Sequence, residues 1–271
     1  MSERPLTYNE YLGLSSLLDL QRTQSDPPDR DEVLFIVVHQ VYELWFKQSL
    51  LEIQAVIDSL LEGEALVAMK ALKRIHAIFR VILSQIDVLE TMTPVDFLNF
   101  RNLLGSSSGF QSAQFRCIEV ACGGGTSASF AQLDLNADLE EAERWLRQHN
   151  VYEAALTYLW RQGRAIPDFY LEPGSARGFD RPVDPNLEKV IEDVYNAHQR
   201  GGAFFEAYLL LEGLVEFDEL FSMWRYRHVK MVERTIGSKR GTGGSAGIKY
   251  LRTTLRYRFF PEIWTARSRL G

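Results

Sequence analysis

Apolar side chains recur every three or four residues along most of the 271-residue chain, the spacing of helices that pack on a core. The alternation of apolar and polar positions that is typical of strands is not sustained anywhere. We therefore predict an all-α bundle forming one domain over residues 1–271, with helices within 7–22, 31–53, 63–90, 94–104, 136–163 and 187–236. Residues 248–271 are expected to form a basic amphipathic helix with a short tail.

The segment Asp31–Ile53 is apolar on nearly every face, which indicates burial, and Asp31 is its expected N-cap. Its middle nevertheless carries three polar side chains, and burying such a group without a partner costs roughly 2–7 kcal/mol. The helical stripe that holds them consists of Phe35, His39, Tyr42, Glu43 and Phe46. The pattern leaves three interpretations open: a satisfied core, the wall of a site, or a metal pair formed by His39 and Glu43.

Two further residues stand out by their surroundings. His228 follows Trp224 by four residues on the apolar face of the last long helix, and Arg101 is the only positive charge in the short segment that begins at Thr93. Core histidines on separate helices are typical of cofactor sites in bundles, although single core histidines are commonly structural. We interpret His76 as a partly exposed helix residue.

The loop at 238–247, SKRGTGGSAG, has backbone N–H groups that can close around a small polar or anionic group. It lacks the order of a phosphate-binding loop. The segment CGGGTSASF, residues 122–130, indicates a flexible break.

Charge and composition exclude several classes of protein. The net charge of −6 and the lack of any Lys/Arg block argue against nucleic acid as a partner. Cys117 and Cys122 have no Cys or His framework that would indicate a zinc site or disulfide scaffold. No secretory signal and no long uncharged apolar run is visible, so we expect no membrane association and a cytoplasmic location.

Three long segments resemble the tryptophan 2,3-dioxygenase family, whose members are haem enzymes that open the indole ring of L-tryptophan. These are LFIVVHQVYELWFK at 34–47, FLNFRNLLGSSSGFQSAQFR at 97–116 and WRYRHVKMVERTIGSKRGTGGSAGIKYL at 224–251. They occur in the family's order, and with TYNEYL at 7–12 they cover nearly the whole chain. The resemblance implies an all-α fold with a buried haem b, O₂ as co-substrate and N-formylkynurenine as product.

The resemblance also implies roles for the residues of the haem and indole sites. His228 matches the proximal ligand of the haem iron, and Ser108 matches a serine near the haem edge. His39 matches the distal histidine beside the indole N–H. Phe35 packs on the indole, and Phe97 completes the apolar wall.

Other matches concern the amino-acid end of the substrate and the neighbouring subunit. Arg101 matches the arginine that pairs with the substrate carboxylate, and Thr242 matches the residue that meets the ammonium and carboxylate groups. Tyr8, Tyr11 and Leu12 match residues that complete the pocket of a neighbour in a homotetramer. Residues 1–30 are accordingly expected to dock on another subunit.

Four positions depart from the family pattern: Val38 and Val41 around the distal histidine, Phe97 where many bacterial members have Tyr, and Met231 near the proximal ligand. They leave an alternative open, a haem monooxygenase that converts a tryptophan derivative, such as β-methyltryptophan, to a 2-oxindole. A haem or indole sensor without turnover and a purely structural bundle are the remaining alternatives.

Overall fold

The computed structural model describes residues 4–130, 136–199, 204–237, 239 and 247–270. Within these ranges every regular element is helical, so the predicted all-α fold is confirmed. None of the helices there is long and apolar enough to cross a membrane. The elements in chain order are α1 (Tyr8–Leu12), α2 (Leu14–Leu17), α3 (Arg30–Glu62), α4 (Ala65–Leu89), α5 (Pro94–Arg101), α6 (Ala113–Ala121), α7 (Asn136–Arg147), α8 (Val151–Arg161), α9 (Pro185–Gln199), α10 (Phe205–Ile236), α11 (Ile248–Thr253) and α12 (Pro261–Ala266).

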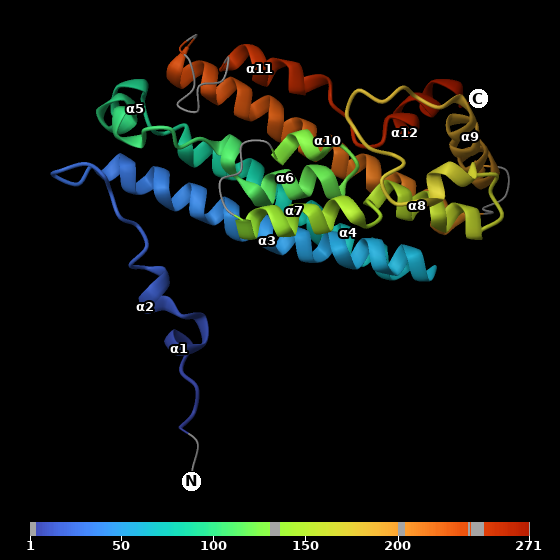
Figure 1. Ribbon diagram of the computed structural model, residues 1–271, viewed down its shortest axis with the longest axis horizontal. Helices are drawn as coiled ribbons and strands as arrows, with labels where there is room; N and C mark the ends of the chain where they lie inside the picture. Colours follow the sequence, from blue (N-terminus) through green and yellow to red (C-terminus); the bar gives the residue numbers. More distant parts are fainter. Residues whose placement is uncertain (1–3, 131–135, 200–203, 238, 240–246, 271) are drawn as a thin grey trace.

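The three longest helices form the centre of the bundle (Figure 1). Helix α4 packs against both α3 and α10, while α6 and α8 cover α3 and α12 packs on α9. Side chains that are fully buried between these helices include Ile53, Leu60, Phe79, Phe217 and Phe221. This packing holds α3 and α10 on two sides of the same core, which is what places their polar residues opposite each other.

The first long helix begins and ends outside the predicted limits. Asp29, not Asp31, is its N-cap, because the Asp29 carboxylate accepts a hydrogen bond of 2.8 Å from the Asp31 amide. The helix continues past Ile53 to Glu62 because its apolar stripe stays buried, and it ends where Gly63 adopts a left-handed conformation with φ of 87°.

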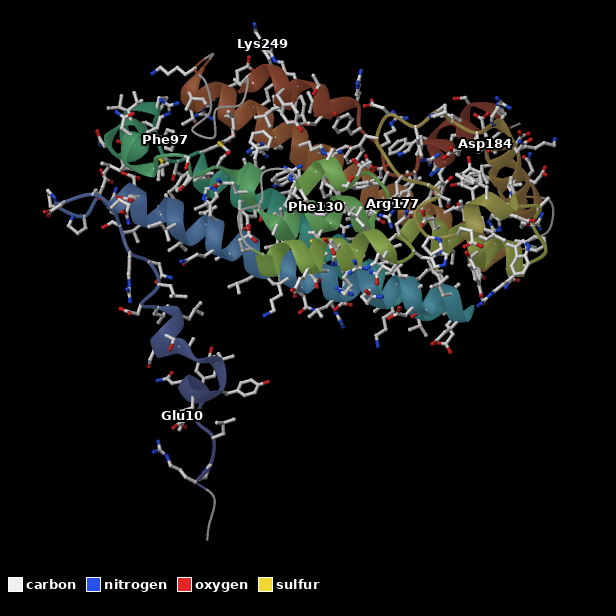
Figure 2. The ribbon with its side chains drawn as sticks, in the orientation of Figure 1. Glu10, Phe97, Phe130, Arg177, Asp184 and Lys249 are labelled. Carbon is white, nitrogen blue, oxygen red and sulfur yellow. The ribbon has the colours of Figure 1, made fainter. Side chains whose placement is uncertain are left out.

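The N-terminal segment differs from its prediction as one amphipathic helix. Gly13, with φ of 62°, separates α1 from α2, and neither of these short helices has a buried residue. The segment extends away from the helical body as an arm (Figure 1). Figure 2 shows Glu10 on this arm, far from Phe97 in the body.

The C-terminal segment also differs, because it is not one amphipathic helix. Helix α11 is followed by a short 3₁₀ turn and extended backbone at Tyr257, and Pro261 then starts α12. The backbone amides of Phe259 and Phe260 donate to the buried carboxylate of Asp218, at 3.0 and 3.3 Å. A buried side-chain acceptor therefore replaces the helical hydrogen bonds at this break.

Close packing at two places was not visible in the sequence: the interpretation of His76 as partly exposed was wrong, while the expected break after Ala121 is present but closely packed. His76 is buried, and its Nε2–H donates to the carbonyl of Gly213 at 2.9 Å. Gly213 permits this approach of α4 to α10, since a Cβ there would lie 2.8 Å from Leu72 Cδ2. The glycines at 123–125 are likewise buried, and a side chain at Gly124 would overlap the ring of Phe179.

Candidate active site

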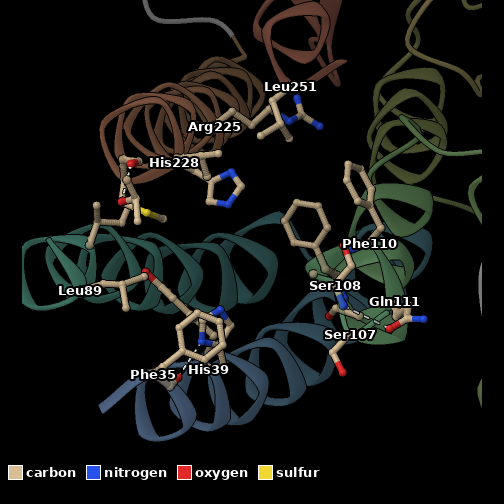
Figure 3. Close-up of a pocket in the computed structure, with 18 of the residues that line it drawn as sticks. Phe35, His39, Leu89, Ser107, Ser108, Phe110, Gln111, Arg225, His228 and Leu251 are labelled. Atoms are coloured by element: carbon tan, nitrogen blue, oxygen red, sulfur yellow. Dashed lines mark hydrogen bonds between the residues drawn. The ribbon is translucent and has the colours of Figure 1, made fainter. Parts of the chain in front are cut away.

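A cavity of about 580 Å³ lies between α3, α4, α5, α6, α10 and α11. Its volume is within the usual range of ligand and cofactor sites, about 300–1,000 Å³. Of the predicted site residues, the structure brings together Phe35, His39, Phe97, Arg101, Ser108 and His228 in its walls. Figure 3 shows His39 on α3 and His228 on α10 directed toward the cavity from opposite sides.

The orientation of His39 is fixed by its own helix. Its Nδ1 lies 2.7 Å from the carbonyl oxygen of Phe35, one turn earlier, and the two rings are 4.1 Å apart between centroids. Because a carbonyl only accepts, Nδ1 carries the hydrogen in the neutral ring and Nε2 remains an acceptor. The walls of the cavity lower the pKa of His39 by burial, against the opposing effects of the Phe35 carbonyl and Glu43. His39 is therefore neutral at neutral pH.

His228 is also held neutral. Burial, with a smaller contribution from the nearby His39, lowers its pKa to about 4. Its ring stacks on Trp224, and no hydrogen bond joins it to the residues that the structure describes. A neutral imidazole with an available lone pair is the form in which histidine binds a metal.

Aromatic rings form the wall between His39 and α5. Phe35 lies 5.8 Å from Phe97 and 5.7 Å from Phe100 between ring centroids, and Phe97 and Phe100 are 5.4 Å apart with perpendicular planes. Such separations are those of favourable aromatic pairs. The wall offers a flat apolar molecule a face on which to pack.

Arg101 and Ser108 lie on the connection from α5 to α6. The capping box of Thr93 and Asp96 starts α5, and Arg101 is its last residue. Ser108 caps the following 3₁₀ turn, where its hydroxyl accepts from the Phe110 amide at 3.4 Å. Both side chains are partly buried and line the cavity.

A buried ionic cluster in the cavity wall was not predicted. Glu119 on α6 pairs with Arg116 at 2.5 Å and with Arg225 on α10 at 2.9 Å, so two guanidinium groups share one carboxylate. Burial lowers the pKa of Arg225, an effect that Glu119 opposes. The three-residue spacing of Arg116 and Glu119 on one helix was the one signal of this cluster that the sequence offered. Arg225 could not be assigned to the cluster, because it comes from a helix more than a hundred residues later.

Glu43 lines the cavity too, but its carboxylate accepts a hydrogen bond of 2.8 Å from Gln114 on α6. No group of three or more His, Cys, Asp or Glu side chains suited to a metal occurs within the described residues. The arrangement therefore does not support the alternative that His39 and Glu43 form a metal pair.

Three predicted residues do not line this cavity. Tyr8, Tyr11 and Leu12 lie on the N-terminal arm, where they are exposed by 73%, 74% and 43%. Thr242 lies outside the described residues.

The fold and cavity define an all-helical protein with two neutral histidines facing each other across an aromatic ligand site. The family model of tryptophan 2,3-dioxygenase matches residues 1–159 and 188–270. Curated proteins of that name are 45% identical over 98% of this chain and 96% of their own length in Anaeromyxobacter sp. (strain K), and 44% identical over 98% and 95% in Nocardioides sp. (strain ATCC BAA-499 / JS614). The relative from Herpetosiphon aurantiacus is 41% identical over 98% of both chains. The chain belongs to the tryptophan 2,3-dioxygenase family, which confirms the resemblance of its three segments.

Proposed function

We propose that this protein is a haem-dependent dioxygenase that inserts both atoms of O₂ across the indole C2–C3 bond of L-tryptophan and yields N-formylkynurenine. The observation that carries this proposal is the opposition of His228 and His39 across an aromatic cavity, in a chain of this family. The names of the relatives favour the dioxygenase over the 2-oxindole-forming monooxygenase.

The residues around the cavity fit a haem. His228 is neutral, faces the cavity and offers a ring nitrogen to the iron. Arg116 lines the cavity, and its guanidinium group suits the carboxylates of a haem. Ser108 would lie near the edge of the macrocycle. A haem b held by His228 would supply the redox chemistry that activates O₂.

The remaining residues would orient the substrate. His39 Nε2 would accept a hydrogen bond from the indole N–H, which its fixed tautomer permits. Phe35 and Phe97 would hold the ring, and Arg101 would pair with the carboxylate. Orientation of this kind supplies much of the catalytic contribution of a protein when a cofactor carries the reaction. Thr242 keeps the role in binding the amino-acid end that the resemblance implies.

We also infer a homotetramer in which residues 1–30 dock on a neighbouring subunit, while residues 1–271 act as one domain. The exposed apolar side chains of the arm support this inference, because a segment that buries none of them against its own chain gains stability by docking elsewhere. Tyr8, Tyr11 and Leu12 would then complete the neighbour's pocket. The cytoplasmic location remains a prediction.

The proposal is tested by supplying haem during expression and assaying the reduced protein with tryptophan and O₂. We expect a haem-loaded protein that forms N-formylkynurenine, loss of haem in His228→Ala, and retained haem with a lower rate in His39→Ala. His149→Ala, a partly buried histidine outside the cavity, is the matched control and should behave as the wild type. A 2-oxindole product, haem binding without product or a colourless protein would each contradict the proposal.

A further inference from the structure

The imidazole of His228 lies against one flat surface, the indole of Trp224. The two ring centroids are 5.1 Å apart and the planes differ by 7°, an offset parallel stack between residues one helical turn apart on α10. Both side chains line the cavity. Rotation of the imidazole about its Cβ–Cγ bond would turn its edge into the indole face, so the stack restricts the plane of the ring.

Trp224 is itself held from two sides. Its ring lies 5.0 Å from Phe115 on α6 and 6.1 Å from Phe221 on α10, between centroids. Its buried Nε1–H interacts with the hydroxyl of Tyr42 on α3, where it partly offsets the rise in the Tyr42 pKa that burial causes. These neighbours fix the orientation of the indole face that Trp224 turns toward His228.

We propose that Trp224 is a positioning residue for His228: its indole face sets the plane in which the His228 imidazole approaches the iron. This inference rests on the proposed function, because it takes His228 as the iron ligand. Iron-ligating histidines are commonly oriented by a hydrogen bond at the ring nitrogen that does not bind the metal. In the described part of this site the orienting contact on the imidazole is a stacked ring.

The test compares two substitutions in the haem-loaded protein. Trp224→Phe keeps a flat ring at the stacking position, whereas Trp224→Leu removes it. The first readout is the iron–imidazole stretching band of the ferrous protein in resonance Raman spectra, and the second is the rate of haem transfer to excess apomyoglobin. Trp145→Leu is the control, since Trp145 is also a tryptophan packed in the fold, fully buried rather than partly buried, and lies on α7 outside the cavity.

We expect Trp224→Leu to shift or broaden the band and to release haem about two- to tenfold faster, which is the effect of losing one favourable aromatic pair. Trp224→Phe should keep the wild-type band. Trp145→Leu should also leave the band unchanged, even if this substitution makes the protein less stable. A wild-type band and release rate in Trp224→Leu would overturn the inference. If Trp224→Leu does not fold, Trp224→Met replaces it: a changed band with faster haem release would support the inference, and wild-type behaviour would overturn it. An unchanged iron–imidazole band in His228→Ala would instead overturn the proposed ligand.

Discussion

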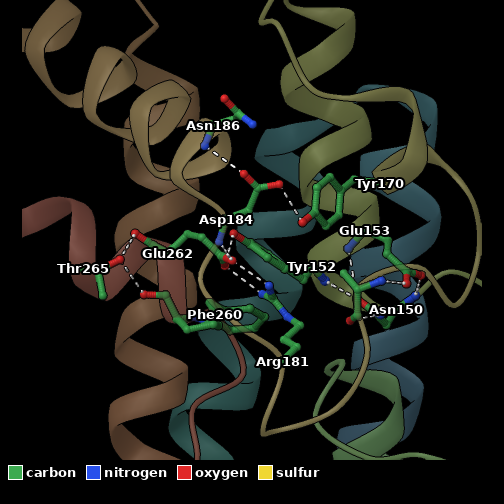
Figure 4. A network of polar contacts seen from close by, with 12 residues as sticks. Asn150, Tyr152, Glu153, Tyr170, Arg181, Asp184, Asn186, Phe260, Glu262 and Thr265 are labelled. Atoms are coloured by element: carbon green, nitrogen blue, oxygen red, sulfur yellow. Dashed lines mark hydrogen bonds and ion pairs between the residues drawn. The ribbon is translucent and has the colours of Figure 1, made fainter.

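The surroundings of the buried Glu262 carboxylate and the cavity between α3 and α10 are two polar regions with opposite arrangements. Glu262 is fully buried, and both of its carboxylate oxygens are paired (Figure 4). Arg181 donates to both oxygens at 2.6 and 2.7 Å, the Tyr152 hydroxyl donates at 2.9 Å and the Asp184 amide at 3.1 Å. A carboxylate with this many donors is a structural group, because burial without them would be strongly unfavourable.

In the cavity, by contrast, the rings of His39 and His228 are directed toward the space where a ligand would bind. His39 is bonded at Nδ1, and neither histidine has a further hydrogen bond to the described residues. Both rings are kept neutral by burial, which removes the cost of a buried charge but not the capacity to bind. The difference teaches that the carboxylate which holds this part of the fold is fully paired inside it, while His39 and His228 each keep a ring nitrogen available for a ligand in the cavity.

The largest effect is expected from breaking the paired region. Glu262→Leu should lower the free energy of unfolding by about 3–5 kcal/mol, because it leaves the Arg181 guanidinium buried without its counter-ion. Urea denaturation followed by circular dichroism measures this change. Tyr152→Phe, which removes one neutral donor, is the control and should cost about 1 kcal/mol. Equally small decreases of the free energy of unfolding in both variants would mean that the hydrogen bonds and ion pair of Glu262 contribute little to stability.

A smaller effect, on function rather than folding, is expected in the cavity. Arg101→Ala should lower kcat/KM for tryptophan about 30-fold, the equivalent of about 2 kcal/mol, if Arg101 makes the proposed charge-assisted contact to the substrate carboxylate. Arg101→Lys should recover part of it, since an ammonium keeps the charge but not the planar two-point contact. Arg144→Ala, outside the cavity, is the control. An unchanged KM in Arg101→Ala would contradict its placement at the carboxylate.

His76 is a buried histidine whose two ring nitrogens, unlike those of His228 within the described residues, have partners in the fold, the Gly213 carbonyl and Glu216. Burial lowers its pKa, while Glu216 and the Gly213 carbonyl act in the opposite direction and Arg80 adds to the lowering. The pKa of His76 is about 6.5 in the unfolded chain and lower in the folded protein, so between these two values the unfolded chain binds more protons at this position than the folded protein does. His76 therefore makes the protein less stable as the pH falls through this window. His76→Gln should flatten the pH dependence of unfolding in that window and leave haem binding unchanged. An identical pH dependence in both proteins would contradict the stated direction.

The smallest effect on folding is expected in the N-terminal arm. Tyr11 is 74% exposed, so Tyr11→Ser should change the free energy of unfolding of the subunit by no more than about 0.5 kcal/mol. The same variant should weaken subunit association, as measured by sedimentation velocity at decreasing concentration. Glu10→Gln, on the same arm, is the control for a polar change there. Unchanged association in Tyr11→Ser would count against docking through this residue.

Residues on single helices could be predicted from the sequence. The stripe containing Phe35 and His39 needed only the helical period, and Pro94 with Thr93 correctly placed the start of α5. The convergence of these residues with His228 in one cavity came from the family resemblance, since spacing along a helix says nothing about which helices face each other.

Features that depend on contacts between distant segments could not be predicted. His76 is buried because Gly213 lets α4 approach α10, and Arg225 meets Glu119 only after α6 and α10 have packed. The glycines at 123–125 indicated a flexible break by composition alone, yet each is closely packed, and Gly124 leaves the space that the ring of Phe179 occupies. Local patterns report conformational preference, whereas burial is decided by the partner surface.

The central claim, that the open cavity holds a haem on His228 and cleaves tryptophan, is tested most directly by product mass after reaction of the reduced protein under ¹⁸O₂. The account predicts N-formylkynurenine carrying two labelled oxygen atoms, formed by the wild type and not by His228→Ala. A 2-oxindole carrying one labelled atom, or the absence of labelled product, would contradict it.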